Sequence, residues 1–586
     1  MTDRMLPLDI RARLARLREK RTEILGMPPE KALNAILEAE EPLPLVHSFA
    51  EEDFYFLVHD IGPADSLPLL ALASGRQWEY LLDLEIWQKD GISQSNLITW
   101  LSLLMQADSG RLTAWLRDEK TDLLEYCLHR NVSVIMREHD QDPADFGDEY
   151  ATFDDVYYFR ILDAAGDPEA GGLDEGRRYE FLAAMLAQLA ETDFVKYQQI
   201  LVESTTLLPA ETEEELYRWR NIRLAEKGFL PFEEALGVYQ PLGRDELAAF
   251  RGKPVVKKDR GLIPFSLSPA VLLRGEDPFG RAVRSLKTAA AVEQVQIELA
   301  ALCNRLMAAD QVVARERETL GRMVAKASGY LSLGLQRLME EEGREATDEL
   351  AAGLILNHSL TDIFRIGYDR VVKLKDRADK WRKNSWYAGA GLPLSFWGEH
   401  RVGVIGGLMI KKPLYFDAFR TGVLYREFQT GNDLRETDAV LREVAALDRL
   451  LSLLIPVVPA ALAGRGPAWD SLLLTLWAGA RLGLAEKAPV PFPRFKLFFQ
   501  ELLPPAGPAA DSGGKAKGGT GTRRIPPAMK QAFLVWLGRE TGLAEKELLA
   551  DLGATFDKLF ADMENEYAAV AAESLDPRYI HLFLLE

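Results

Sequence analysis

The sequence predicts a mainly α-helical protein, and three observations carry this prediction. Leu- and Ala-rich stretches with apolar residues at helical spacing, such as Phe364, Val371 and Leu374, fill most of the 586 residues. Glycine and proline stand where such stretches stop and restart, as at Gly228 and Pro231. A weak internal repeat near the N-terminus has a period typical of stacked helices. Length alone indicates about three or four domains.

Composition divides the chain into five predicted segments. The Pro- and Gly-rich segment 504–527 is a linker, because its composition cannot bury enough apolar surface to become ordered. The C-terminal module that follows it, residues 528–586, either captures a partner or docks on the rest of the chain as a lid. The segments are an N-terminal basic helix with helical repeats (1–137), an acidic linker region (138–177), a larger central helical domain (178–503) with an insert (381–416), a flexible linker (504–527) and a small tethered helical module (528–586).

The N-terminal segment has a basic amphipathic helix followed by the repeat. Residues 9–25 place an apolar stripe beside several arginines, so this helix either binds a partner or packs on the rest of the protein. The repeat has an offset of 43 residues, and each copy reads as one helix followed by two shorter ones. Ser93 and Asp108 are expected to cap the starts of helices in this region. Extended helical repeats usually bind other macromolecules. The aligned residues are Phe54, Leu57, Val58, Ile61, Asp65, Leu69, Leu72 and Leu81 with Leu97, Trp100, Leu101, Leu104, Asp108, Leu112, Trp115 and Leu124.

Charge and cysteine usage indicate a cytoplasmic protein without a transmembrane segment. The net charge of −19 disfavours a protein-wide affinity for nucleic acid. Cys127 and Cys303 lie far apart, build no disulfide framework and are expected to be small buried apolar residues. The start of the chain lacks signal-peptide features. The longest apolar run, 450–464, contains two prolines and is too short to cross a bilayer.

The insert differs in character from the helices around it. Its aromatic residues alternate with glycines, which favours a non-helical segment docked on a helical body. Residues 403–412 contain glycines and two lysines, but Pro413 stands where a phosphate loop needs Ser or Thr. We therefore expect a buried hairpin or strand there.

A basic and aromatic patch at 365–387 is the candidate ligand site. Basic side chains interleaved with aromatics hold a nucleic-acid backbone and stack its bases. The same pattern also fits a helix whose last turn is basic because of the helix dipole, followed by aromatics that fill a domain seam. The candidate ligand-binding residues are Arg377, Lys380, Arg382, Lys383, Trp386, Tyr387 and Trp397.

Catalytic and metal-binding patterns are scarce. Glu399 and His400 form the only acid–histidine pair in the insert and are the candidates for general acid–base work. Adjacent residues on a strand point in opposite directions, so this pair needs loop geometry to cooperate. None of the seven histidines forms a zinc-type motif, and no nucleophile elbow or kinase motif is present. We expect no metal and no cofactor, and an enzyme is the less favoured interpretation.

Two turns and two helical patterns carry a resemblance to a known group. The run 220–229 followed by 231–239, with the patterns at 67–84 and 363–380, resembles an uncharacterised bacterial helical family, a domain of unknown function. The likeness covers most of the chain and implies a helical fold and no reaction. The N-terminal repeat also resembles the cytoplasmic superhelical domain of MgtE-type magnesium transporters, without a matched metal motif.

The predicted function is macromolecular interaction. The architecture favours a non-catalytic scaffold or adaptor whose partner is another protein. The first alternative is a binder of nucleic acid or of a phosphorylated ligand through the patch at 365–387. The second is an enzyme with a site near Glu399 and His400. The sequence leaves the oligomeric state open.

Overall fold

The structure is a computed structural model that describes residues 8–88, 90–163, 175–242, 266–273, 275–312, 315–343, 346–504 and 523–586. The chain divides into two compact units, Met1–Gly367 (unit 1) and Tyr368–Glu586 (unit 2). Both are mainly α-helical, which confirms the predicted fold class. Within the described parts, no helix combines the length and the low polarity needed to cross a membrane.

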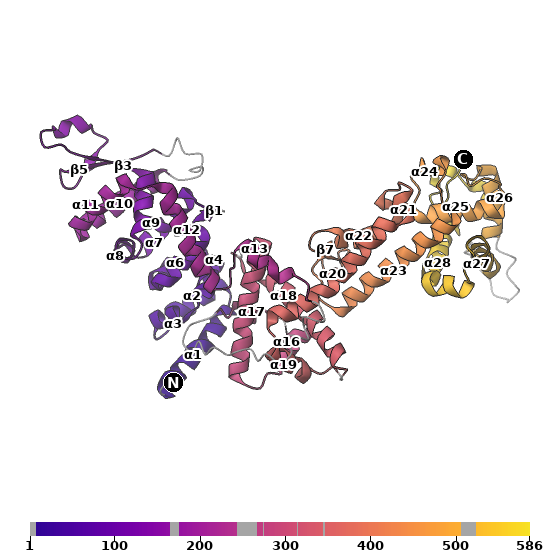
Figure 1. Cartoon of the computed structure of the whole chain (residues 1–586), viewed down its shortest axis with the longest axis horizontal. Coiled ribbons are helices and arrows are strands. Elements are labelled where there is room, and N and C mark those ends of the chain that lie inside the picture. Colours follow the sequence, from indigo (N-terminus) through magenta and orange to yellow (C-terminus); the bar gives the residue numbers. More distant parts are fainter. Residues whose placement is uncertain are drawn as a thin grey trace, which may run out of the picture. The chain divides into compact units, whose positions relative to one another are not determined.

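Unit 1 is built from helices with a few short strands (Figure 1). Its first helices are α1 (Leu8–Leu25), α2 (Pro29–Leu37), α3 (Pro42–Ser48), α4 (Glu51–Ile61), α5 (Leu67–Leu72), α6 (Gly75–Glu85), α7 (Gln94–Ala107), α8 (Ser109–Asp118) and α9 (Thr121–Asn131). Its later helices are α10 (Glu175–Thr192), α11 (Phe194–Thr206), α12 (Pro209–Glu226), α13 (Phe232–Ala235), η4 (Leu236–Tyr239), α15 (Ser268–Leu272), α16 (Pro278–Arg284), α17 (Ala289–Asp310), α18 (Arg317–Glu342) and α19 (Asp348–Asn357).

Helix α1 packs on the body of unit 1. It contacts α2, α3 and α15, and Ile24 and Leu25 are buried. Arg21 is buried as well and donates to the carbonyl oxygen of Ser48. Arg18 donates to Glu293 over 3.2 Å. These contacts support the packing interpretation of the basic helix.

The region of the predicted repeat consists of two triplets of helices, α4–α5–α6 and α7–α8–α9. Side-chain caps that the sequence predicts are confirmed at two starts: Ser93 accepts from the backbone N–H of Asn96 and Asp108 from that of Arg111. Ser74 and Gln77 form a capping box that starts α6. The two triplets share their order of helices, and their relation as repeats stays a prediction.

A small sheet spans the end of the predicted N-terminal segment and part of the predicted acidic linker region. Strands β3 (Val132–Met136), β5 (Tyr157–Ile161) and β4 (Ala151–Thr152) pair antiparallel in the order β3-β5-β4, and Val132 pairs with Ile161. The short helix η1 (Pro143–Phe146) lies between β3 and β4. One of the acidic side chains stabilises a turn: Asp154 accepts hydrogen bonds from the backbone N–H groups of Val156 and Tyr157. Residues 164–174 of the predicted linker lie outside the described residues.

Two glycines allow close packing of α18 on the first turns of α20 (Leu360–Asn384). A Cβ atom on Gly334 would lie 2.0 Å from the carbonyl oxygen of Ile363. A Cβ atom on Gly367 would lie 1.9 Å from the carbonyl oxygen of Tyr330. Both distances are far below van der Waals contact with backbone atoms, so only glycine fits at either position.

Unit 2 begins within α20 and ends in a shared aromatic core. Trp477 packs edge-to-face against Phe533 and Phe560, so the residues predicted to form a tethered module dock on the body of unit 2. The predicted linker lies largely outside the described residues, and the five domain boundaries stay predictions. The elements after α20 are α21 (Trp386–Gly389), η5 (Leu394–Trp397), α22 (Glu399–Met409), β6 (Tyr415–Phe416), β7 (Tyr425–Arg426), α23 (Gly431–Leu454), α24 (Ala460–Ala463), α25 (Trp469–Arg481), α26 (Phe492–Leu502), α27 (Pro527–Thr541), α28 (Glu545–Tyr567), η6 (Ala572–Ser574) and η7 (Pro577–Tyr579).

The prediction of a non-helical insert at 381–416 is wrong. Most of it is helical, through the end of α20, α21, η5 and α22, and only β6 and its approach are extended. Two glycines seat α22 on the β6–β7 hairpin: a Cβ atom would lie 2.4 Å from the Phe416 ring at Gly403 and 2.5 Å from the Leu414 carbonyl oxygen at Gly407. Glycine therefore serves helix packing here, and the expected strand at 403–412 is a helix up to Met409.

We predict that Gly334→Ala and Gly367→Ala each destabilise unit 1 by about 3 kcal/mol or more, because the added methyl group overlaps backbone atoms. Gly321→Ala in the same helix α18 is the control, since its Cβ atom would meet nothing within 4 Å. It should stabilise the protein by roughly 0.5–1 kcal/mol. Thermal unfolding of the three variants measures this, and equal effects at Gly334 and Gly321 would contradict the packing.

Candidate ligand-binding site

The basic residues predicted to bind a ligand lie near the C-terminal end of α20. Arg377 forms an ion pair with Asp438. Lys380 and Lys383 are exposed. Arg382 is exposed too, and its guanidinium lies 3.6 Å from the sulfur of Met409. These four residues share one surface helix, and their ligand-binding role stays a prediction.

The aromatic residues of the same prediction pack on one another. Trp381 stacks on Tyr387 at 5.4 Å, and Trp397 lies edge-on to both. Trp397 is 0% exposed and Tyr387 is 5% exposed, so neither presents a ring face to solvent. Trp386 is half-buried and donates from its indole N–H to the carbonyl oxygen of Ile455 over 2.9 Å. This packing fits the alternative in which the aromatics fill a seam in the fold.

Glu399 and His400 do not converge. They are consecutive residues of α22, and neighbouring side chains on an α-helix project about 100° apart. Glu399 lines a hollow of 390 Å³ with Ser395, Phe416 and Tyr425, whereas His400 does not line it. Burial of the ring, reinforced by the charge of Arg401, lowers the pKa of His400.

A better-formed site lies in unit 1, where α6 meets α12. Asp83 of α6 accepts two hydrogen bonds from Arg223 of α12, at 2.8 Å from Nε and 2.7 Å from Nη2. Its backbone carbonyl accepts a third from Arg220 Nε at 2.6 Å. Paired N–H groups of arginine on one carboxylate are among the strongest polar contacts in proteins. We call this arrangement the Asp83 clasp.

Helical spacing places two cavities beside the clasp. Leu216, Trp219 and Arg223 of α12 line a smaller cavity of 320 Å³. The next face of α12, with Tyr217, Arg220, Asn221 and Leu224, lines a larger cavity of 590 Å³. Residues three and four apart share a helix face, so each cavity takes one face of α12. Trp87, of strand β1 (Trp87–Gln88), lines both; this strand pairs with β2 (Gly91–Ile92).

The larger cavity is lined mainly by aromatic and aliphatic side chains. Among the described residues that line it, Glu52 and Arg220 are the only charged ones, and the amide side chains are those of Asn221, Asn304 and Gln311. Arg220 lies over the ring of Trp87 at 5.4 Å, so its charge is held against an aromatic wall. The aromatic lining residues are Tyr55, Phe56, Tyr80, Trp87, Tyr217, Phe229 and Phe232.

Glu52 contributes a carboxyl group to this cavity. Burial raises its pKa to about 7, although the nearby charge of Lys227 opposes the shift. Lys227 Nζ lies 3.5 Å from Glu52 and 2.5 Å from Glu51. A carboxyl group with a pKa near neutrality in a cavity is a recognised mark of a functional site.

A second buried carboxylate supports the wall of the larger cavity. Glu85 accepts a 2.6 Å hydrogen bond from the Tyr55 hydroxyl and one of 3.1 Å from Arg315 Nε. The imidazole Nε2 of His59 lies 3.2 Å from the same oxygen. Burial alone would raise the pKa of Glu85, but these partners lower it below its usual value. The network therefore fixes Tyr55, which lines the cavity, in one orientation.

The two cysteines are buried free thiols, as predicted. Burial raises the pKa of both thiols, to about 12, which leaves them unreactive. Among the described residues, no group of His, Cys, Asp or Glu side chains is arranged to hold a metal ion.

Comparison with known proteins places the chain in a family. A model of DUF6178, described as a family of unknown function, matches residues 9–586. The chain belongs to the DUF6178 family. This confirms the predicted resemblance to an uncharacterised family, whereas the resemblance to MgtE-type proteins is not supported. Neither the curated proteins nor the solved structures contain a match.

The sequence patterns do not reveal the cavities of this DUF6178 chain. The segment 220–239 shows turn signals, yet Arg220, Asn221, Phe229 and Phe232 line the larger cavity. One usable signal was the acidic start of α4, where Glu52 and Asp53 share a helix with Tyr55 and Phe56. Acidic residues in the first turn of a helix are commonly explained by the helix dipole. The sequence therefore gives no sign that Glu52 and Asp53 are buried.

We predict that Glu52→Gln changes the pH dependence of stability. Because the folded-state pKa is raised from 4.5 to about 7, wild-type stability should fall as the pH rises through this window, by up to about 3 kcal/mol. The glutamine variant lacks this loss. The difference in melting temperature, variant minus wild type, should therefore be more positive at pH 8 than at pH 5. Glu214→Gln, on the exposed side of α12, is the control. A Glu52→Gln difference that is constant with pH would refute the assignment.

Proposed function

We propose that unit 1 of this DUF6178 chain binds a small molecule in the larger cavity. The observation that carries the proposal is a 590 Å³ cavity that combines aromatic walls with one carboxyl group whose pKa lies near neutrality. Small-molecule sites occupy about 300–1,000 Å³ and join apolar walls to a few placed polar groups. The cavity meets both criteria.

The lining indicates a planar ligand with little charge. Aromatic rings stack on planar apolar groups, and the amides of Asn221, Asn304 and Gln311 offer hydrogen bonds to uncharged polar atoms. Asn304 is buried, and its amide nitrogen is already fixed by a 2.6 Å bond to the Lys227 carbonyl oxygen. Glu52, when protonated, donates a hydrogen bond, so it recognises an acceptor without demanding a positive charge.

We predict that filling the larger cavity weakens ligand binding. Ala308 of α17 lines it, so Ala308→Trp should weaken binding of 2-naphthol, a fluorescent planar probe, at least about tenfold. Leu84→Trp fills the same cavity from the α6 side and serves if the first variant does not fold. Ala184→Trp on the exposed face of α10 is the matched control. Saturable binding that survives both cavity-filling variants, or no saturable binding to wild type, would contradict the proposal.

A protein-interaction role is a second proposal for the chain, in line with the sequence-based prediction. Helix α11 and the neighbouring sheet leave apolar side chains in solvent: Val195 is 76% exposed, and Phe194, Met136 and Phe153 are exposed as well. Helix α11 contacts β3, so these residues belong to one region of unit 1. Contiguous exposed apolar surface is typical of a protein-binding site.

The alternative of nucleic-acid or phosphorylated-ligand binding through the basic residues of α20 has its own test. The full-length protein is purified from its host at low and at high salt, and co-eluting molecules are identified. The basic patch predicts nucleic acid at low salt only, lost in Arg382→Glu/Lys383→Glu and kept in Arg539→Glu/Lys546→Glu, which reverses two exposed charges elsewhere in unit 2. A scaffold predicts a protein partner that survives high salt. Nucleic acid retained by Arg382→Glu/Lys383→Glu would refute the patch.

A further inference from the structure

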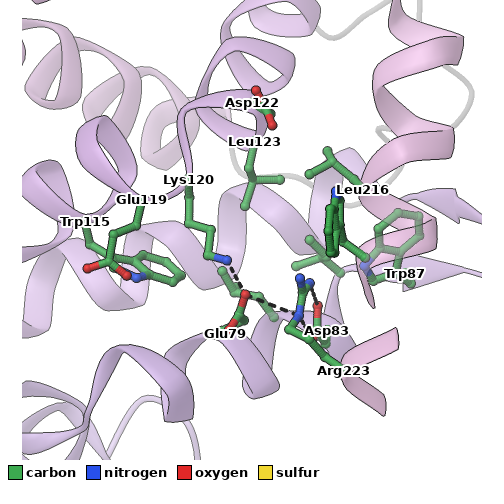
Figure 2. Close-up of a pocket in the computed structure, with 13 residues that line it drawn as sticks. Glu79, Asp83, Trp87, Trp115, Glu119, Lys120, Asp122, Leu123, Leu216 and Arg223 are labelled. Atoms are coloured by element: carbon green, nitrogen blue, oxygen red, sulfur yellow. Dashed lines mark hydrogen bonds and ion pairs between the residues drawn. The ribbon is translucent and has the colours of Figure 1, made fainter. Parts of the chain in front are cut away.

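The smaller cavity differs chemically from the larger one. Helices α6, α8, α9 and α12 line it, together with the loop residues Glu119 and Lys120 and with Trp87. Figure 2 shows charged side chains meeting at its floor, with aromatic and aliphatic residues around them. The cavity measures 320 Å³, which suits a ligand of modest size.

The charges at the floor neutralise one another. Lys120 forms an ion pair with Glu79, and Arg223 bridges Glu79 at 3.2 Å and Asp83 at 2.7 Å (Figure 2). Two bases and two acids are therefore matched. An anionic ligand would have to compete with Glu79 and Asp83 for both bases, which makes it a poor occupant.

The remaining charge is negative and lies at the exposed edge. Glu119 and Asp122 line the cavity and are exposed. In the described part of the chain, neither carboxylate forms an ion pair. The lining as a whole, with four acids and two bases, carries a net charge of −2. Such an edge attracts a cation.

Three tryptophans supply the apolar part of the cavity. Trp87, Trp115 and Trp219 line it, and Trp219 is half exposed. Indole rings attract cations at their faces. Lys120 already lies 5.9 Å from the Trp115 ring, but its charge is matched by Glu79. Trp115 is 6% exposed, and its indole N–H has no acceptor among the described residues.

We propose that the smaller cavity is a second binding site, which takes an organic cation: a protonated amine carried on an apolar or aromatic body. The ammonium group lies toward Glu119 and Asp122, and the body packs against the tryptophans. This site is separate from the site proposed for the larger cavity and takes a ligand of different charge.

Phenethylamine, which is a cation at pH 7, and phenylacetate, an anion of similar shape, test the proposal. Calorimetric titration of the full-length protein should show binding of phenethylamine, weakened by salt and at least about fivefold weaker in Glu119→Gln/Asp122→Asn. The control, Glu211→Gln/Glu214→Gln, removes two exposed carboxylates of α12 and should leave it unchanged. Trp219→Leu should weaken binding without a change in melting temperature.

The outcomes separate this site from the larger cavity. Phenethylamine binding that survives Ala308→Trp, with 2-naphthol binding that survives Glu119→Gln/Asp122→Asn, supports two sites. Phenylacetate binding as tightly as phenethylamine, no effect of Glu119→Gln/Asp122→Asn, no phenethylamine binding, or its loss in Ala308→Trp would each overturn the proposal. None of these four results bears on whether 2-naphthol binds the larger cavity.

Discussion

The Asp83 clasp is the contact on which both cavities depend. Arg220 and Arg223 lie three residues apart on α12, and both reach the same residue of α6, so the clasp fixes the rotation of α12 about its axis. That rotation turns Trp219 toward the smaller cavity and Tyr217 toward the larger one. Burial raises the pKa of Asp83, and Arg223 opposes the shift. Removing Arg223 would leave a buried carboxylate unpaired, a change that typically costs about 3–5 kcal/mol.

The two units use aromatic residues in different ways. In unit 2 the rings pack on one another: Trp381, Tyr387 and Trp397 form one cluster, and Trp477 joins Phe533 in another. Such rings stabilise the fold by removing apolar area from water. In unit 1, Tyr80 and Trp87 pack on the rings of Tyr55 and Tyr217 and, in addition, line the larger cavity. Both proposed binding sites lie in unit 1 for this reason.

Much of the helical fold could be predicted from the sequence, because helix signals are local. Apolar spacing revealed the helices, and short-range chemistry revealed the caps at Ser93 and Asp108. The helical conformation of the insert could not be predicted, because Gly403 and Gly407 resemble helix breakers in the sequence. Only the tertiary structure shows that they make room for Phe416 and Leu414. A glycine required by tertiary packing carries no local mark of that role.

The candidate site could not be predicted because it is assembled from distant segments. The clasp joins residues 137 and 140 positions apart in the chain. On its own, α6 presents Glu79 and Asp83 as ordinary surface acids, and their ion pairs need Lys120 and Arg223, which are distant in the sequence. The aromatic and basic candidates at 365–397, by contrast, are close together in the sequence, so their pattern is visible there. The structure explains most of the aromatics as packing.

Hydrogen–deuterium exchange of the full-length protein, with and without saturating 2-naphthol, tests most directly where ligand binds. We expect slower exchange in α6 and α12, because a ligand between them adds contacts to both helices and suppresses their local opening. We expect no change across 381–416. Protection confined to 381–416, or unchanged exchange in α6 and α12 on saturation with 2-naphthol, would contradict a binding site beside the Asp83 clasp.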